Sequence, residues 1–363
     1  MGGVAPYPSR ARKASQGRER RMRPTASSRA GRIGRLEVCR CADYDSRVTS
    51  PLVSVSVDLD AVACYHRIHA LADGPSDESR FAILRRALPR LAELFARHGI
   101  SATLFTVGRD LEDDAEGRRI LAELAKAGHE IASHSYSHPY DLVRLGREKI
   151  TDEIDRAQAA IADACGKAPV GFRAPGYEIS AELIDLLCER GFRYDSSAFP
   201  AIPYYLAKAA VMAGLRVAGR KSGSILGSPR VLAAPCVPYR PAAGAPYRRG
   251  NLPILEMPVT VTPLLRLHVI GTMLVISPEW LRRRLVASAL TTKHFNLELH
   301  GIDLADAEPD GYSPALVSHQ PDLRVPLARK IAALDATLTE ARAAGATFVT
   351  LAQAAEQFLA EGV

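Results

Sequence analysis

The sequence predicts an α/β fold in which a parallel sheet closes into a barrel. From Pro51 onward, segments with strand character alternate with segments of helical periodicity, and most connections between them are short. Such alternation gives a parallel sheet covered by helices, and seven or eight strand–helix units are enough for closure into a barrel. An open, doubly wound sheet is the alternative. A proline-rich stretch near 200–250 breaks the rhythm, and we interpret it as a long insertion.

The expected elements follow from apolar periodicity and from the residues that end helices. Strands are expected at 52–58, 102–107, 130–134, 171–174, 192–195, 254–261, 295–300 and 347–350. Helices are expected at 79–98, 116–126, 148–165, 181–190, 278–290 and 325–344, with a last helix ending at Leu359. Glycine follows several of these helices, as is common at C-termini, and Pro89 is expected to kink the first.

The net charge of +7 belongs to the N-terminal segment. Residues 1–50 hold 12 Lys and Arg against 4 Asp and Glu (+8), and the remainder holds 35 against 36 (−1). Residues 1–48 are rich in Arg, Ser, Gly and Pro, which favours disorder. We therefore expect a disordered basic tail at 1–48 and a catalytic barrel at 49–363. Because a nucleic-acid-binding domain would carry its basic residues on a folded surface, we expect no nucleic-acid partner; binding through the tail is the alternative.

Cysteine usage and hydropathy favour a cytoplasmic location. The six cysteines are irregularly spaced and do not resemble a disulfide framework. Cys39 and Cys41 are separated by one residue, where zinc ribbons and redox motifs usually have two. No run of about 18 apolar residues could form a membrane-spanning helix, and the basic N-terminus lacks the apolar region of a signal peptide. Membrane association is the alternative.

Polar residues fall at the carboxyl ends of the predicted strands, where α/β barrels hold their active sites. The residues at or just beyond these ends are Asp58, Asp60, His134, His138, Arg173, Asp195 and His300. Each residue by itself is weak evidence for function. Their shared position predicts one site at one end of the barrel.

Asp60, His134 and His138 form the predicted metal site. Two imidazoles four residues apart on a helical turn can converge on one ion. Two histidines and one carboxylate with an open position suit a catalytic ion, and zinc, cobalt, nickel or iron would accept them. Asp58 shares a strand face with Asp60, so a cation would relieve the repulsion between the carboxylates. Surface histidines and a carboxylate that caps a helix are the alternatives.

Five segments in order resemble the motifs of the polysaccharide deacetylases, carbohydrate esterase family four. They are VDLDAVA (57–63), HSYSHP (134–139), FRAPGY (172–177), YDSS (194–197) and LELHGID (297–303). The first motif places the chain closest to the branch that reads V-D-x-D-A-V-A. The resemblance covers about 52–360 and implies a deformed (β/α) barrel of seven or eight units. It also implies a divalent metal, zinc before cobalt, nickel or iron, on the three predicted ligands.

The resemblance further implies the catalytic roles. Asp58 would be the general base, Arg173 would hold and tune it, and His300 would be the general acid. A histidine titrates near neutral pH and can protonate a leaving amine. Apart from the resemblance, Asp195 is the predicted partner that orients His300, because catalytic histidines commonly have such a partner. Asp303 is the alternative for that role, and a plain turn residue is the alternative for Asp195.

Two departures from the family pattern concern the substrate side. Gly176-Tyr177 stands where many members have Tyr-Gly, so the N–H of either residue is a candidate for the oxyanion. The fourth motif has no tryptophan, since the only one is Trp280, and Phe199 is expected against the acyl group. The basic stretch Tyr204–Arg220 is predicted to form a lid over the site, with peripheral membrane contact as the alternative.

The predicted function is hydrolysis of a carbon–nitrogen bond in a linear amide. A metal would polarise the carbonyl and make bound water more acidic. The expected substrate is an N-acylated, chiefly N-acetylated, amino sugar or polysaccharide. The alternatives are deformylation of a lipid-linked amino sugar, hydrolysis of another non-peptide amide, and, from another class, a catalytically inactive sugar-binding barrel.

Overall fold

The computed structural model describes residues 50–217, 219 and 222–363, so the predicted tail at 1–48 lies outside the described residues. The strands are β1 (Leu52–Asp58), β2 (Thr103–Thr106), β3 (Glu130–Ser133), β4 (Gly171–Phe172), β5 (Tyr194–Asp195), β6 (Pro241–Ala242), β7 (Ala245–Arg249), β8 (Leu255–Glu256), β9 (His294–His300) and β10 (Thr347–Phe348). The α-helices are α1 (Val62–Ile68), α2 (Leu88–Arg97), α3 (Gly108–Asp113), α4 (Ala115–Lys126), α5 (Arg147–Cys165), α6 (Ala181–Glu189), α7 (Ile202–Val217), α8 (Gly271–Ile276), α9 (Glu279–Ala289), α10 (Pro314–His319), α11 (Leu327–Ala343) and α12 (Leu351–Ala360).

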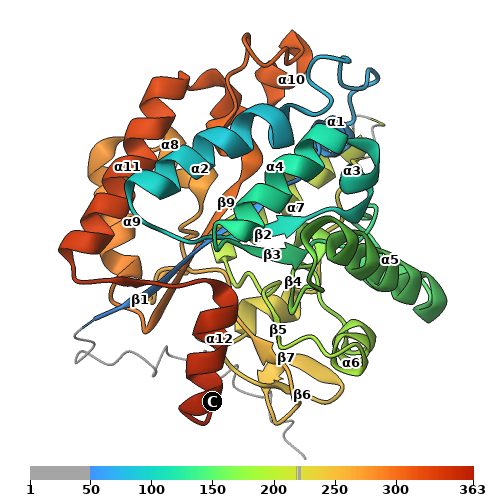
Figure 1. Cartoon of the computed structure of the whole chain (residues 1–363), viewed down its shortest axis with the longest axis vertical. Helices are drawn as coiled ribbons and strands as arrows, with labels where there is room; N and C mark the ends of the chain where they lie inside the picture. The colour runs from blue at the N-terminus through green and yellow to red at the C-terminus, as the bar shows by residue number, and fades with distance from the viewer. Residues whose placement is uncertain (1–49, 218, 220–221) are drawn as a thin grey trace, which may run out of the picture. The chain divides into compact units, whose positions relative to one another are not determined.

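Eight parallel strands form the central sheet, in the order β10-β1-β2-β3-β4-β5-β8, with β9 on the other side of β1. All seven residues of β1 pair with β9, in the register Leu52 with His294 to Asp58 with His300. β10 pairs with the start of β1 and β2 with its end. These two strands therefore share one side of β1, which makes the barrel irregular. Helices α2, α4 and α5 follow one another across the near side of the strands (Figure 1).

Side chains help to complete the ring between β8 and β9. The backbone N–H of Asn296 donates to Thr260 Oγ1 (2.8 Å), and the Asn296 amide donates to Met257 O (3.2 Å). A parallel bridge joins Ile270 to Glu298. The deformed barrel predicted from the sequence is thus confirmed, with a short, partly side-chain-mediated seam.

The two faces of β1 and β9 differ in chemistry because successive side chains on a strand point to opposite faces. The residues that join the apolar core under the helices are Val53, Val55, Val57, Phe295, Leu297 and Leu299. The residues that alternate with them are Ser54, Ser56, Asp58, His294, Asn296, Glu298 and His300. Hydrogen bonds between the strands, such as Ser56 Oγ to Asn296 Oδ1 (3.0 Å), satisfy this second face. The barrel interior below the site is therefore polar.

Most predicted elements lie within a few residues of their expected bounds, and the differences have local causes. The predicted helix at 79–98 begins its regular part as a π-helix, Ile83–Ala87, followed by α2. The π-helix ends two residues before Pro89, which has no N–H to donate to the turn that precedes it. Helices α1, α3, α8 and α10 were not expected, because six or seven residues each are too few to display a helical period.

The predicted insertion contains α7 and the antiparallel hairpin β6–β7. Its loop after α7 attaches to the end of α1, where Gly223 N donates to Arg67 O (2.8 Å) and Ser222 Oγ to Ile68 O (2.7 Å). The start of α7 packs inward through Tyr204, whose ring lies 4.9 Å from that of Phe199. Within the described ranges, no helix has the length and apolar character needed to cross a bilayer.

Candidate metal and catalytic site

The predicted site residues come from strands that neighbour one another in the sheet. Asp58 ends β1 and His300 ends β9, and these two residues are register partners. His134 follows β3 directly, and Arg173 follows β4. Since the strands are parallel, their carboxyl ends meet at one edge. The order β9-β1-β2-β3-β4 therefore places these residues around one end of the barrel.

Asp60, His134 and His138 converge on one point. Asp60 Oδ1 lies 3.2 Å from His134 Nε2 and 3.1 Å from His138 Nε2, and the three residues are buried. Burial would raise the pKa of Asp60, but the His138 and His134 rings hold it well below its ordinary value, so the carboxylate is ionised. Asp60 Oδ1 and His138 Nε2 are buried without a hydrogen-bond partner. Two orphaned ligand atoms aimed at one point suit a cation.

The other ring nitrogens leave Nε2 of both histidines available. His134 Nδ1 lies 2.7 Å from Arg173 O, so the proton resides on Nδ1, as in metal-binding histidines held by a carbonyl. His138 Nδ1 faces Cys64 Sγ at 3.5 Å. Burial and the Asp60 carboxylate raise the pKa of the Cys64 thiol, so the group beside His138 is a neutral thiol.

The loop that carries the two histidines is not the helical turn that the sequence predicts. Ser135 and His138 have φ of +64° and +56°, a region that costs free energy for residues with a side chain. Glu153 on α5 holds the loop, accepting from the N–H groups of Tyr136 (3.0 Å) and Ser137 (2.8 Å). The two imidazoles therefore converge because a strained loop is anchored by a carboxylate from a neighbouring helix.

A buried guanidinium network holds Asp58. Arg173 Nη1 donates to Asp58 Oδ1 (2.6 Å), while Nη2 donates to Ser56 Oγ (3.0 Å) and Ser196 Oγ (2.9 Å). Arg173 is completely buried, yet the carboxylate of Asp58 outweighs the burial penalty, and the pKa of Arg173 is raised. The arginine thus occupies one oxygen of Asp58, and Tyr177 Oη lies 3.3 Å from the other, Oδ2.

The ring of His300 is oriented by Glu298, a residue that the sequence interpretation missed. His300 Nδ1 lies 2.8 Å from Glu298 Oε1, and the glutamate is fully buried. Burial lowers the pKa of His300, but Glu298, aided by Asp60 and Asp58, raises it well above its ordinary value. The charged imidazolium is therefore favoured, with Nε2 directed toward Tyr177 Oη at 3.3 Å.

The expectation that Asp195 orients His300 is wrong. Asp195 ends β5, which pairs with β8 away from β9, and its Oδ1 accepts from Ser197 Oγ (2.6 Å). Its register partner is Glu256, and burial together with the Asp195 charge raises the pKa of Glu256 well above its ordinary value. The alternative, Asp303, accepts from the backbone N–H of His300 (2.8 Å) and leaves the ring to Glu298.

An aromatic cluster forms one wall beside the catalytic residues. The Tyr177 ring lies 5.2 Å from Phe199, which lies 4.9 Å from Tyr204, and His268 packs against Tyr204 at 6.0 Å. Trp280, by contrast, is 61% exposed on α9. Phe199 is thus positioned beside the site residue Tyr177, as the acyl-pocket expectation requires.

The comparisons with known proteins agree with this fold. Residues 73–194 match the polysaccharide deacetylase family model, a segment that includes the second and third motifs. A peptidoglycan deacetylase of Helicobacter pylori is 34% identical over 158 residues, 43% of this chain and 53% of that protein. A chitooligosaccharide deacetylase of Bradyrhizobium is 37% identical over 89 residues, 24% of this chain and 38% of that protein. Residues 73–194 are thus similar to the polysaccharide deacetylases, which agrees with the resemblance of the five motifs.

A solved structure supports the fold of this barrel. A Mycobacterium smegmatis crystal structure assigned to the polysaccharide deacetylases superposes with a TM-score of 0.56 at 20% identity, covering 86% of this chain and 92% of the other. At that identity the likeness shows the fold alone. The chain spans about half the length of the first curated relatives that it matches.

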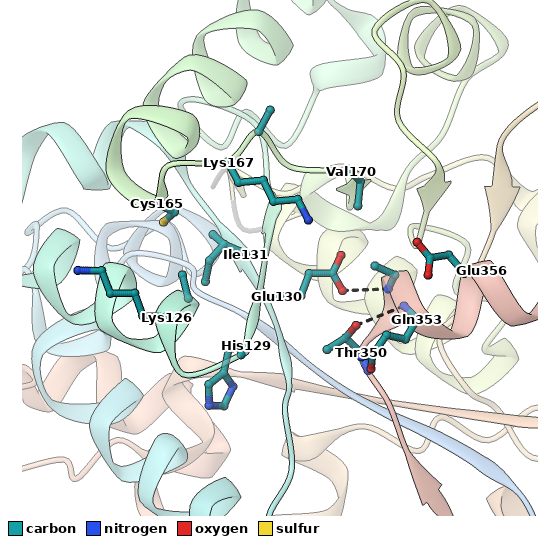
Figure 2. Close-up of a pocket in the computed structure, with 14 residues that line it drawn as sticks. Lys126, His129, Glu130, Ile131, Cys165, Lys167, Val170, Thr350, Gln353 and Glu356 are labelled. Atoms are coloured by element: carbon teal, nitrogen blue, oxygen red, sulfur yellow. Dashed lines mark hydrogen bonds between the residues drawn. The ribbon is translucent and has the colours of Figure 1, made fainter.

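A separate pocket of about 390 Å³ opens at the opposite end of the barrel, beside the start of β3 (Figure 2). One of its two acidic groups, Glu130, accepts from Ala352 N (2.9 Å), Thr103 Oγ1 (2.8 Å) and Tyr194 Oη (2.7 Å). Glu130 is therefore satisfied as a tie between β3 and the start of α12. None of the predicted site residues lines this pocket.

Proposed function

We propose that this protein is a metal-dependent hydrolase that removes an N-acyl group, chiefly N-acetyl, from an amino sugar or polysaccharide. The observation that carries the proposal is the convergence of Asp60, His134 and His138, with Asp58 and His300 at the adjoining strand ends. Two imidazoles and one carboxylate match zinc before other divalent ions. The ion would polarise the acyl carbonyl and make a water molecule more acidic.

Asp58 accepts the proton of the attacking water in this proposal. Arg173 occupies Oδ1, so Oδ2 is the oxygen that can take the proton. Tyr177 Oη lies 3.3 Å from both Asp58 Oδ2 and His300 Nε2. The Tyr177 hydroxyl therefore lies between the proposed base, Asp58, and the proposed acid, His300. The reacting amide would lie in the same region.

His300 protonates the amine as the carbon–nitrogen bond breaks. Its raised pKa keeps the ring charged near neutral pH, and Glu298 holds Nδ1 so that Nε2 gives the proton. For the oxyanion, the N–H of Gly176 is the better of the two candidates, because the N–H of Tyr177 already donates to Ala174 O (3.0 Å). Phe199 would contact the acyl group through the aromatic wall.

Metal analysis combined with an acyl-release screen tests this proposal. The purified protein is assayed for released acetate and formate over N-acylated amino sugars and their oligomers. Asp58→Asn should lower turnover by about 10²- to 10⁴-fold while metal content is retained, because the general base is lost. Asp73→Asn, at an exposed position, is the matched control. Unchanged turnover in Asp58→Asn, or none on any acylated sugar, would leave the inactive sugar-binding barrel as the better account.

A second candidate, deformylation of a lipid-linked amino sugar, is favoured by the exposed surface of α7. Leu206, Val211 and Val217 are 59%, 62% and 90% exposed, and Leu264 and Leu265, between the bridged residues 261 and 268, are 94% and 68% exposed. Exposed apolar side chains of this kind can enter a lipid interface. Flotation with phosphatidylglycerol vesicles, abolished by Leu206→Ser with Val211→Ser and accompanied by formate release, would support it. Absence of flotation would favour a substrate in solution.

A further inference from the structure

Lys208 on α7 reaches the rim of the candidate site. A methyl group placed on Gly176 would lie 4.0 Å from Lys208 Nζ and 3.1 Å from Cδ1 of Tyr140. The Tyr140 ring packs edge-on against the ring of His138 at 4.7 Å. The Lys208 ammonium therefore lies beside the backbone of Gly176 and near the Tyr140 ring, which contacts the proposed metal ligand His138.

No described residue takes the Lys208 ammonium as a hydrogen-bond or ion-pair partner. The acidic side chain that affects the pKa of Lys208 is Glu178. It lies beyond salt-bridge distance of the ammonium, and its Oε1 accepts from Ser228 N (2.7 Å). Burial lowers the pKa of Lys208 to about 8, against the opposing effect of Glu178. Lys208 is half-buried, and partial burial of an unpaired ammonium is unfavourable, so a bound anion would stabilise it.

A second cation lies on the same rim. Arg67, at the end of α1, has Nη2 3.5 Å from His138 O and 3.2 Å from Cys64 Sγ, and it is exposed. The Arg67 charge opposes the strong rise that burial gives to the pKa of Tyr140, so Arg67 also acts on this ring. The insertion is attached to α1 at Arg67 itself, through Gly223. Attachment of the insertion to α1 thus brings α7 and its lysine to the rim on which Arg67 lies.

We propose that Lys208 is a specificity residue that binds an anionic group, a carboxylate or a phosphate, on the N-acylated amino sugar. The inference rests on the proposed function and adds a substrate class to it. An ammonium beside the reacting centre recognises either anion as a point charge. Neutral acylated sugars would lack this contact and bind more weakly. The exposed Arg67 would supply a second cation to the same group.

Three probes with the same acetamido sugar test the proposal by calorimetry on the full chain. They are N-acetylglucosamine, which is neutral, N-acetylmuramic acid, which adds a carboxylate, and N-acetylglucosamine 1-phosphate, which adds a phosphate. We expect one anionic probe to bind the wild type about 10-fold or more tightly than the neutral sugar, the range of a charge-assisted hydrogen bond. The anionic probe that binds more tightly shows whether Lys208 recognises a carboxylate or a phosphate on the sugar.

Substitutions then assign the preference to Lys208. Lys208→Met should remove the preference for the anion and raise KM for the anionic substrate with little change in kcat, and Lys208→Arg should restore most of the affinity. Arg216→Met, an exposed cation on the same helix, is the matched control and should change nothing. Equal affinity for all three probes, no measurable binding of either anion, or an anion preference that survives in Lys208→Met would overturn the proposal. Anion binding that depends on Lys208 without any acyl release would instead refute the proposed function and leave the anion site standing.

Discussion

Replacing Glu298 with Gln should shift the pH dependence of catalysis through His300. The carboxylate lies 2.8 Å from His300 Nδ1 and is fully buried, while the His300 side chain is 18% exposed, so solvent screens the pair only weakly. An opposite charge at this distance typically changes a pKa by about 1 to 3, which corresponds to about 1.4 to 4 kcal/mol. Loss of the carboxylate should therefore lower the pKa of His300 by that amount.

The sign of the effect follows from the proposed role of His300 as an acid. The imidazolium is present below its pKa and lost above it, so lowering the pKa moves the alkaline limb of the kcat profile to lower pH. Glu298→Gln should lose about 10- to 1000-fold in kcat at pH 8, because the charged fraction of the ring falls about 10-fold each time its pKa drops by 1. At pH 5.5 to 6, the loss should be smaller.

The assay is acyl release measured from pH 5 to pH 9 with metal content determined at each point. Asp195→Asn is the matched control, because it also removes a buried carboxylate but contacts Ser197 instead of His300. The alkaline limb of its kcat–pH profile should lie at the same pH as that of the wild type. If the limb is unmoved in Glu298→Gln, or moves equally in Asp195→Asn, then Glu298 does not set the protonation of His300.

The remaining predictions concern the groups around the site. Cys64→Ala should weaken metal affinity about 10-fold, as loss of a residue that supports a ligand does, because the thiol faces His138 Nδ1; unchanged affinity in a competition titration would contradict this. Arg173→Met should lower the free energy of unfolding by about 3 to 5 kcal/mol, since it leaves a buried carboxylate unpaired; a denaturant midpoint equal to the wild type would refute it. Glu256→Gln should raise Tm more at pH 8 than at pH 5: the pKa of Glu256 is raised by burial and by Asp195, so its stabilising contribution is present at low pH and lost as pH rises toward the folded pKa. An equal Tm change at both pH values would argue against that linkage.

The sequence predicts the fold and the position of the site because both depend on local patterns. Strand–helix alternation predicts the barrel, and polar residues at strand ends predict where Asp58, Asp60 and His300 lie. The position of a residue at the end of a predicted strand can be seen in the sequence itself. The distance of Asp60 from His134 is set by three strands and could not be read from spacing.

The residues that the sequence missed act on the site through contacts distant in the chain or through an overlooked pattern. Cys64 and Glu153 support the histidine loop from α1 and α5, and nothing in their local sequence marks that role. Glu298 did carry a signal, because it stands two residues before His300 on one strand and so shares its face. Asp195 was preferred because it ends a predicted strand, as the other site residues do, but the sheet order separates β5 from β9.

Metal stoichiometry tests the central claim most directly. Elemental analysis of the purified full chain should find about one divalent ion per molecule, bound by two histidines and a carboxylate. Asp60→Ala and His138→Ala should each lose most of it, while His129→Gln, at the other end of the barrel, should retain it. A stoichiometry that stays the same in Asp60→Ala and His138→Ala would contradict the account.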